Sequence, residues 1–160
     1  MAEIKEIVAY LMAGFPNKDA LTTARVTKMV YLADWKSSID HYCQMTSIKW
    51  YFDSFGPFVW DVETVVKNDP GTFRIEAGLT QFGSQKKVFR LINSHYQPTL
   101  RDEERAILDH VLKVTKDLDW SRFIQLVYST YPIVASDRYT HLNLPDLANR
   151  YREEKRLNGR

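Results

Sequence analysis

The sequence predicts a mostly α, α+β fold: a compact helical domain around a central helix, with a small antiparallel sheet or hairpin. Three observations predict it. Apolar residues recur at helical spacing up to about residue 42, β-branched and aromatic residues dominate short segments between residues 47 and 92, and helical spacing returns over the last 60 residues. We find no linker, internal repeat or low-complexity tract, so residues 1–160 are expected to form a single domain.

Two helices are predicted at the start of the chain. The first covers residues 3–13 and ends at Gly14 and Pro16, and the second begins near Thr22 or Thr23. The second runs to about Tyr42 and carries two adjacent apolar stripes: Val26, Met29, Val30 and Ala33 in one, Leu32, Trp35, Ile39 and Tyr42 in the other. Because two stripes require contacts on more than one side, we expect this helix to be central.

The middle of the chain predicts strands. The segment SIKWYF is rich in β-branched and aromatic residues and leads into a turn at Gly56-Pro57. Residues 59–67 are predicted to be helical. The segments FRIEAG and KKVFRLI then read as two strands joined by the loop LTQFGSQ. We expect all three strands to form one small antiparallel sheet, because a bare hairpin is only marginally stable.

The last 60 residues predict helices separated by polar caps. Thr99 and Asp102 match a capping box before a helix with a buried stripe at Ile107, Val111, Val114 and Leu118. Asp119 is expected to cap a following helix that groups Phe123, Ile124, Val127 and Tyr131 and ends at Pro132. An ordered loop then leads to a final helix around Leu147, Ala148 and Tyr151, whose charged end is expected to fray.

Composition limits the cellular location and the classes of binding partner that we expect. The net charge of +2 gives no reason to expect nucleic acid or an anionic membrane as a partner. No apolar run reaches the length of a membrane span, and the first residues lack the basic start and cleavage site of a signal peptide. The single cysteine, Cys43, excludes an internal disulfide and fits a reducing compartment. A cytoplasmic location is therefore expected.

Catalytic and metal-binding motifs are missing from the sequence. His41 and Cys43 lie close together, but a structural zinc site needs four ligands at tight spacing. Cys43 follows the negative end of a predicted helix dipole, which disfavours a thiolate. Asp61 and Glu63 point to different helix faces, and we find no nucleophile elbow and no phosphate-binding glycine motif. We expect no enzyme activity, no cofactor and no metal.

One stretch of sequence is unusually aromatic. It holds six rings within eleven residues: Trp50, Tyr51, Phe52, Phe55, Phe58 and Trp60. It contains no Lys or Arg, and Asp53 and Asp61 would repel phosphate, which argues against stacking on nucleic acid. Strand alternation places Trp50 and Phe52 on one face and Tyr51 and Asp53 on the other, with the Asp53 face expected outside. The rings fit either a core or a protein interface.

Two motifs in the first half of the chain resemble a known family. They are the Thr-Lys-hydrophobic-hydrophobic-Tyr-x-Ala-Asp helix in RVTKMVYLADWKSSI and the aromatic strand in IKWYFDSFGPFVWDV. Together with the late segment VYSTYPIVASDRYTHLNLPDLANRYR they resemble the Panacea, or SocA-like, antitoxin domain over roughly residues 20–152. The resemblance implies an antitoxin of a type II toxin–antitoxin system that binds a cognate toxin encoded nearby. It also implies a frequent location in prophages and, in one branch, an adaptor that delivers its toxin to a protease.

The candidate toxin-binding residues surround the Gly-Pro turn: Tyr51, Asp53, Phe55, Phe58 and Trp60. Gly56 and Pro57 are expected to set the turn. Lys28, Tyr31 and Asp34 form the structural part of the motif, with Lys28 and Asp34 on different sides of their helix and pairing with other elements. Three alternatives stay open: a regulatory adaptor, an enzyme using Asp53, Tyr31 or His41, and, ranked last, a nucleic-acid-binding repressor.

Overall fold

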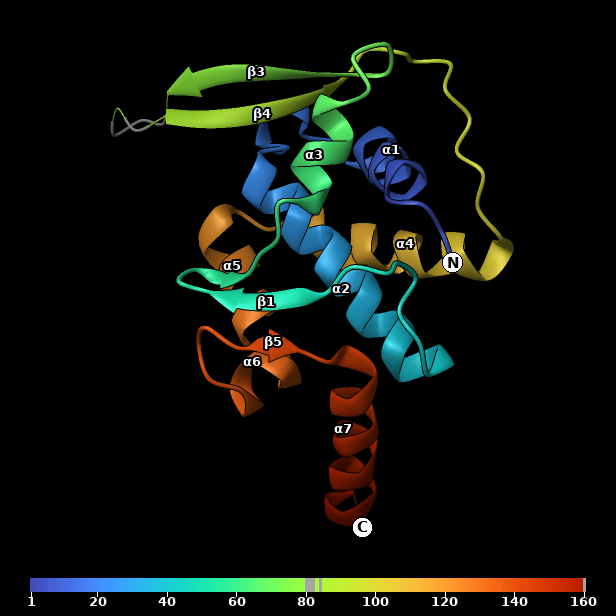
Figure 1. Ribbon diagram of the computed structural model, residues 1–160, viewed down its shortest axis with the longest axis vertical. Helices are drawn as coiled ribbons and strands as arrows, with labels where there is room; N and C mark the ends of the chain where they lie inside the picture. The colour runs from blue at the N-terminus through green and yellow to red at the C-terminus, as the bar shows by residue number, and fades with distance from the viewer. Residues whose placement is uncertain (80–82, 84, 160) are drawn as a thin grey trace.

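The computed structural model of the protein describes residues 1–79, 83 and 85–159. A long helix, α2 (Thr23–His41), runs through the middle of the molecule, as Figure 1 shows. Helices and strands from both ends of the chain pack around it. The surrounding helices are α1 (Ile4–Gly14), the short 3-10 turn η1 (Lys18–Ala20), α3 (Asp61–Lys67), α4 (Asp102–Thr115), α5 (Trp120–Tyr128), α6 (Tyr131–Ala135) and α7 (Leu144–Asn158). The predicted α+β fold around a central helix is confirmed.

Helix α2 begins and ends close to the predicted limits. The Thr22 side chain accepts a hydrogen bond from Arg25 N at 3.2 Å and so caps the N-terminus. Both apolar stripes pack inward, with the exception of the last position, Tyr42, whose side chain is 68% exposed. Tyr42 adopts a left-handed conformation with φ of 64°, which turns the chain out of the helix and the ring into solvent.

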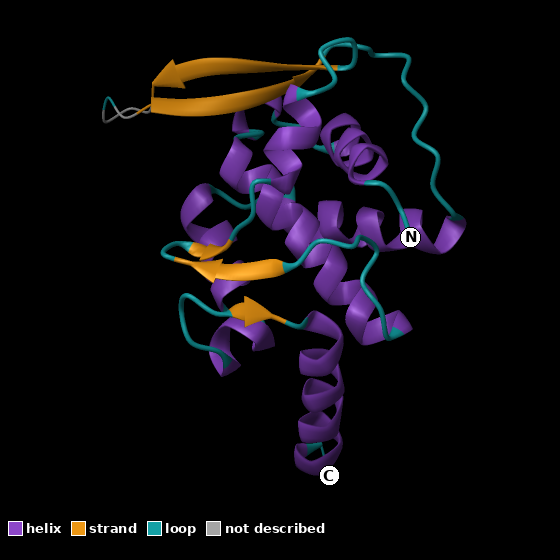
Figure 2. Cartoon of the chain, in the orientation of Figure 1, coloured by secondary structure: helices purple, strands orange, loops and turns teal. Residues whose placement is uncertain are grey.

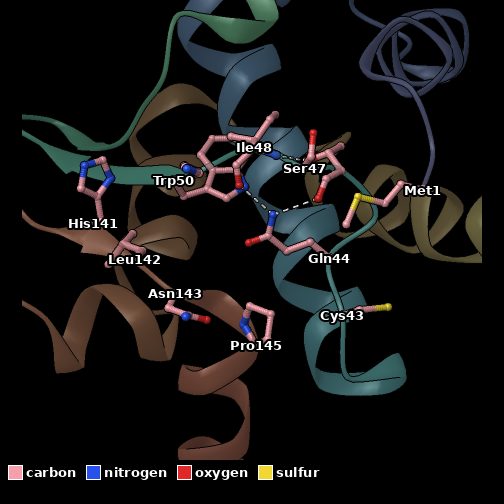
Figure 3. Close-up of a pocket in the computed structure, with 12 residues that line it drawn as sticks. Met1, Cys43, Gln44, Ser47, Ile48, Trp50, His141, Leu142, Asn143 and Pro145 are labelled. Carbon is pink, nitrogen blue, oxygen red and sulfur yellow. Dashed lines mark hydrogen bonds between the residues drawn. The ribbon is translucent and has the colours of Figure 1, made fainter.

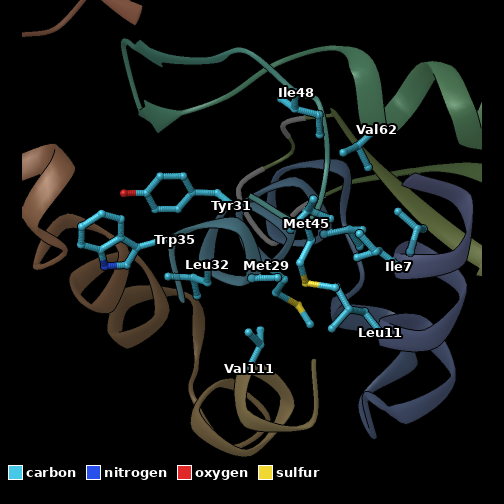
Figure 4. Packing of buried hydrophobic residues seen from close by; sticks show 14 of the residues in the cluster. Ile7, Leu11, Met29, Tyr31, Leu32, Trp35, Met45, Ile48, Val62 and Val111 are labelled. Carbon is cyan, nitrogen blue, oxygen red and sulfur yellow. The ribbon is translucent and has the colours of Figure 1, made fainter. Parts of the chain in front are cut away.

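The hydrophobic core forms where α1, α3 and α4 meet α2. Figure 4 shows Ile7 and Leu11 of α1 close to Met29 of α2, with Val111 of α4 nearby. Met45, from the segment after α2, fills the same cluster. All five side chains are at most 4% exposed, so the interior is built from segments more than 100 residues apart in the sequence.

The strands form two separate sheets, drawn in orange in Figure 2. The first contains β1 (Trp50–Asp53), β2 (Gly56–Pro57) and β5 (His141–Leu142), all antiparallel, with β1 in the middle. The second is the hairpin of β3 (Phe73–Leu79) and β4 (Gln85–Leu91). The prediction that SIKWYF joins this hairpin in one sheet is wrong, because β2 and β5 occupy the two sides of β1.

Helices support the β3–β4 hairpin in place of a third long strand. Phe73 and Phe89 are buried, and Phe89 N donates to Leu21 O at 2.8 Å just before α2. Val88 forms an isolated bridge with Thr22. The hairpin itself was predicted and is confirmed, whereas most of its predicted loop LTQFGSQ lies outside the described residues.

The cap of helix α4 lies two residues after the predicted one. Arg101 precedes the helix, and Glu104 reaches back to accept from Arg101 N at 2.8 Å. The predicted box of Thr99 and Asp102 is wrong because Thr99 N donates instead to the buried carboxylate of Glu6 in α1, at 2.8 Å. Of the predicted stripe, Ile107 and Val111 are buried, whereas Val114 is 38% exposed and Leu118, half-buried, lies beyond the end of the helix.

The C-terminal third contains more structure than predicted. Asp119 accepts from Arg122 N at 2.9 Å, which confirms it as the cap of α5. The prediction that Pro132 ends this helix is wrong, because α5 ends at Tyr128 and Pro132 lies in the first turn of α6. A proline is tolerated there because the first amides of a helix have no partner within it.

The final helix, α7, begins earlier and lasts longer than predicted. Asn143 caps it by accepting from Asp146 N at 3.1 Å. Its first turns pack on α2, and its last turns project from the body of the molecule (Figure 1). The end that we expected to fray is exposed but helical to Asn158. No helix among residues 1–79 and 85–159 is long and apolar enough to cross a membrane.

Candidate functional site

Strand β1 sorts the aromatic stretch into an inner and an outer face. Trp50 is fully buried and Phe52 is 4% exposed, whereas Tyr51 and Asp53 are half-buried on the opposite face. The predicted alternation is confirmed. On the outer face the Tyr51 ring lies 5.1 Å from His141 of β5, and Phe58 N donates to Tyr51 O at 2.9 Å. Phe58, Tyr51 and His141 therefore lie side by side across the small sheet.

The turn between β1 and β2 presents a single exposed ring. Ser54 and Phe55 form the turn, and the Phe55 side chain is 82% exposed. Gly56 and Pro57 lie just after the turn, in β2, rather than at its centre. Gly56 has a φ of 101°, a backbone conformation that residues with a Cβ rarely adopt, so this position favours glycine. The turn residues are Ser54-Phe55, and Gly56 fixes the return strand behind them.

Two further rings lie between the sheet and α3. The Phe58 and Trp60 rings meet edge to face with centroids 5.0 Å apart, and Trp60 is 64% exposed. Neither ring belongs to the buried core, which contrasts with Trp50 and Phe52 ten or fewer residues earlier. Of the six aromatics, two are buried, two are half-buried and two are exposed.

A residue that the sequence did not single out completes this surface. Tyr139 has a φ of 67° and is 61% exposed. Its amide donates to Phe52 O at 2.6 Å, and its hydroxyl lies 3.2 Å from Ser54 Oγ. Only the pairing of β1 with β5, across some ninety residues, brings Tyr139 here, so local sequence patterns gave no signal for it. We call Tyr51, Phe55, Phe58, Trp60 and Tyr139 the aromatic surface.

Arg138, itself exposed, links the turn of the aromatic surface to neighbouring rings. Its guanidinium lies over the rings of Phe52 and Tyr128, 5.5 and 5.9 Å from their centroids. It also donates to Ser54 O at 3.2 Å, which ties the turn between β1 and β2 to the loop before β5. The aromatic surface is therefore fixed in place by contacts between two distant parts of the chain.

Asp34 of α2 fixes the segment that leads into β1. Its carboxylate, 0% exposed, accepts from Met45 N at 2.8 Å, Thr46 N at 3.0 Å, Thr46 Oγ1 at 2.5 Å and Trp50 Nε1 at 2.9 Å. Burial raises the pKa of Asp34 to about 6, while these hydrogen bonds hold it down. As the motif suggested, Asp34 pairs with another element, and it anchors the inner ring Trp50.

Tyr31 and Lys28 lie on the same helix in different surroundings. The Tyr31 ring packs edge to face with Trp50 at 5.6 Å, and its hydroxyl lies 2.8 Å from Thr130 Oγ1. Burial raises the pKa of the Tyr31 phenol. Lys28 is 2% exposed and its Nζ lies 5.5 Å from the centre of the Phe58 ring. Burial lowers the pKa of Lys28 to about 8, with Asp53 acting in the opposite direction.

The residues proposed for an enzyme are not brought together. Tyr31 is buried in the core, His41 is exposed at the end of α2, and Asp53 uses its carboxylate to accept from Ser54 N at 2.8 Å. Among the residues that the structure describes, no group of three or more His, Cys, Asp or Glu side chains is placed to hold a metal.

A groove of about 670 Å³ adjoins the aromatic surface at His141 (Figure 3). It lies between the segment after α2 and the start of α7, and its walls include Gln44, Ile48, Leu142 and Pro145. Gln44 closes one side by donating to Ile48 O at 2.8 Å and Thr46 O at 3.1 Å. The lining is mainly apolar, so the groove extends the apolar character of the neighbouring surface.

Comparison with known proteins identifies the family. Neither the curated proteins nor the solved structures contain a match to this chain. Residues 26–132 match the family model described as antitoxin SocA-like, Panacea domain. The matched region runs from α2 to α6 and includes both the Lys28–Asp34 motif and the turn between β1 and β2. Because the match covers about two thirds of the sequence, the chain belongs to the SocA-like antitoxin family with a Panacea domain.

Proposed function

We propose that this protein is the antitoxin of a type II toxin–antitoxin system, and that it neutralises a cognate protein toxin by binding it directly in the cytoplasm. Membership of the SocA-like antitoxin family is the observation that carries the proposal. We propose binding rather than catalysis as its activity, because Asp53, Tyr31 and His41 lie apart.

The aromatic surface is the part of the molecule that we assign to the toxin. Phe55, Trp60 and Tyr139 are more than half exposed, and a group of exposed large apolar side chains is typical of a surface that binds a partner. Aromatic side chains are enriched among the residues that dominate binding energy at interfaces. A stable complex buries about 1,200–2,000 Å² in total, so the interface would also include surrounding polar residues such as Asp53.

Co-expression with the protein encoded by the neighbouring gene tests the proposal. We expect the two proteins to co-purify and the antitoxin to restore growth to cells that express the toxin. Failure of both tests would contradict the antitoxin proposal. The adaptor alternative makes a different prediction: toxin levels would fall only in cells that contain the host protease.

A further inference from the structure

Lys28 differs from the other buried charged side chains that the structure describes. Glu6, Arg25, Asp34 and Glu104 are each buried, and each has at least one hydrogen-bond partner. Lys28 is 2% exposed, yet within the described residues its Nζ donates no hydrogen bond and lies within 4 Å of no carboxylate oxygen. Burying an unpaired charge is costly, so a lysine in this state requires an explanation.

The surroundings of Lys28 place its ammonium at the base of the aromatic surface. Phe58 lies 5.5 Å from Nζ, and the Cε of Lys28 would lie 3.6 Å from a Cβ added to Gly56. The lysine chain therefore packs against the edge strand β2 next to Gly56. Among the described residues, Thr27 Oγ1 is the one side-chain polar atom that is completely buried and has no hydrogen-bond partner. Lys28 Nζ also has no hydrogen-bond partner, so it is not completely buried and retains a small contact with solvent.

The charges around Lys28 leave its positive charge incompletely neutralised. Asp53 is the acidic group whose charge acts on Lys28, and it lies beyond 4 Å with its carboxylate engaged by Ser54 N. Tyr128 of α5 also lies next to Gly56, 3.4 Å from the position of an added Cβ. Arg138, which is exposed, lies 5.9 Å from the centre of the Tyr128 ring and has no carboxylate within 4 Å among the described residues. This part of the molecule thus offers a buried cation, Lys28, beside the half-buried Phe58 and an exposed cation, Arg138, over Phe52 and Tyr128, which is complementary to an acidic partner.

We propose that Lys28 is a recognition residue that receives an Asp or Glu carboxylate of the bound protein toxin, at the base of the aromatic surface beside Phe58. This inference rests on the proposed function. The surrounding Phe58 and Trp60 rings would exclude water from the new ion pair, in the manner of a ring of apolar contacts around an interface hot spot. Because Lys28 is already desolvated in the free protein, much of the cost of burying its charge is met before the toxin binds.

A binding experiment with matched variants tests this assignment. The dissociation constant of the complex with the neighbouring gene product is measured for the wild type, Lys28→Met and Lys36→Met. Lys36 lies on the same helix and pairs with Asp40 at the surface, 2.9 Å away, so it is a matched control. We expect Lys28→Met to weaken binding about tenfold or more, and Lys36→Met to change it by less than about twofold. Equal affinities for the two variants would overturn the inference and leave the antitoxin proposal standing.

The titration of Lys28 separates recognition from a purely structural role. NMR of the lysine side chain in the free protein and in the complex reports the pKa of Lys28 directly. A carboxylate partner would raise the pKa on binding, and the affinity of the wild type would fall above about pH 8, where the free amine loses its proton. An unchanged pKa in the complex would contradict the inference.

A small-molecule probe keeps the test meaningful if the neighbouring protein does not bind. Acetate is titrated into the free protein at constant ionic strength, with chloride as the control. A saturable shift of the Lys28 side-chain resonances with acetate alone would support a carboxylate site even though the proposed antitoxin pair had failed. No difference between acetate and chloride, together with no toxin binding, would contradict both proposals.

Discussion

At the scale of single residues, Asp34 shows how one buried carboxylate positions a strand. Four donors from residues 45–50 meet its two oxygens, so the chain after α2 is held against the helix before β1 begins. The sequence predicted that Asp34 pairs with another element, and the structure confirms it. The partners could not be named in advance, because two of the four are backbone amides, which carry no residue identity.

Asp34→Asn is expected to lower the free energy of unfolding by about 2–4 kcal/mol, because an amide NH2 replaces one acceptor and leaves a buried donor unpaired. Urea denaturation measures the change. Asp40→Asn is the control, since Asp40 forms an exposed pair with Lys36 whose loss costs less than about 1 kcal/mol. Equal stabilities of the two variants would contradict the role of Asp34.

Lys28 predicts a stability that rises in alkaline solution. Its pKa is about 8 in the folded protein and near 10.5 in the unfolded chain, so the unfolded chain binds more protons between these values. The free energy of unfolding is therefore expected to increase by about 3 kcal/mol from pH 8 to pH 10.5, because the cost of keeping Lys28 buried without its proton falls as the pH rises. Lys28→Met should be more stable than the wild type at pH 7 and should lose this increase. If Lys28→Met is less stable than the wild type at pH 7, and its free energy of unfolding depends on pH in the same way, Lys28 stabilises the fold.

At the scale of secondary-structure elements, local patterns predicted most helices and strands but not how the strands pair. The Thr22 cap, the two stripes of α2 and the β3–β4 hairpin all follow from neighbouring residues. The pairing of β1 with β5 joins residues about ninety positions apart, and no local period encodes it. The predicted capping box failed for the same reason, since the amide of Thr99 donates to Glu6 of α1.

The β3–β4 hairpin depends on its contact with the helices. Phe89 is fully buried beneath it, whereas Leu79 at its far end is 67% exposed. We expect Phe89→Ala to lower the free energy of unfolding by about 3–5 kcal/mol, and Leu79→Ala to change it by less than about 0.5 kcal/mol. Thermal or urea denaturation distinguishes them. A small effect of Phe89→Ala would mean that the hairpin is stable without docking.

At the scale of the whole molecule, the fold exposes one part of the aromatic stretch and buries the other. The alternation along β1 was predictable, and so were the inward positions of Trp50 and Phe52. The exposure of Phe55 and Trp60 depends on what the tertiary structure leaves uncovered. Tyr139 was missed because it reaches the same surface from the C-terminal region, through its bond with Phe52 O. The sequence named Tyr51, Phe55, Phe58 and Trp60 as candidates but did not predict how far each of them is exposed.

We propose that the aromatic surface binds the toxin, and this claim is tested by removing two of its exposed rings. The affinity for the neighbouring gene product is measured for the wild type, for Phe55→Ala/Trp60→Ala, and for Leu157→Ala, an exposed apolar residue near the end of α7. We predict that the double variant binds at least about tenfold more weakly with an unchanged melting temperature, and that Leu157→Ala binds like the wild type. Full affinity in the double variant, or a loss confined to Leu157→Ala, would contradict the claim.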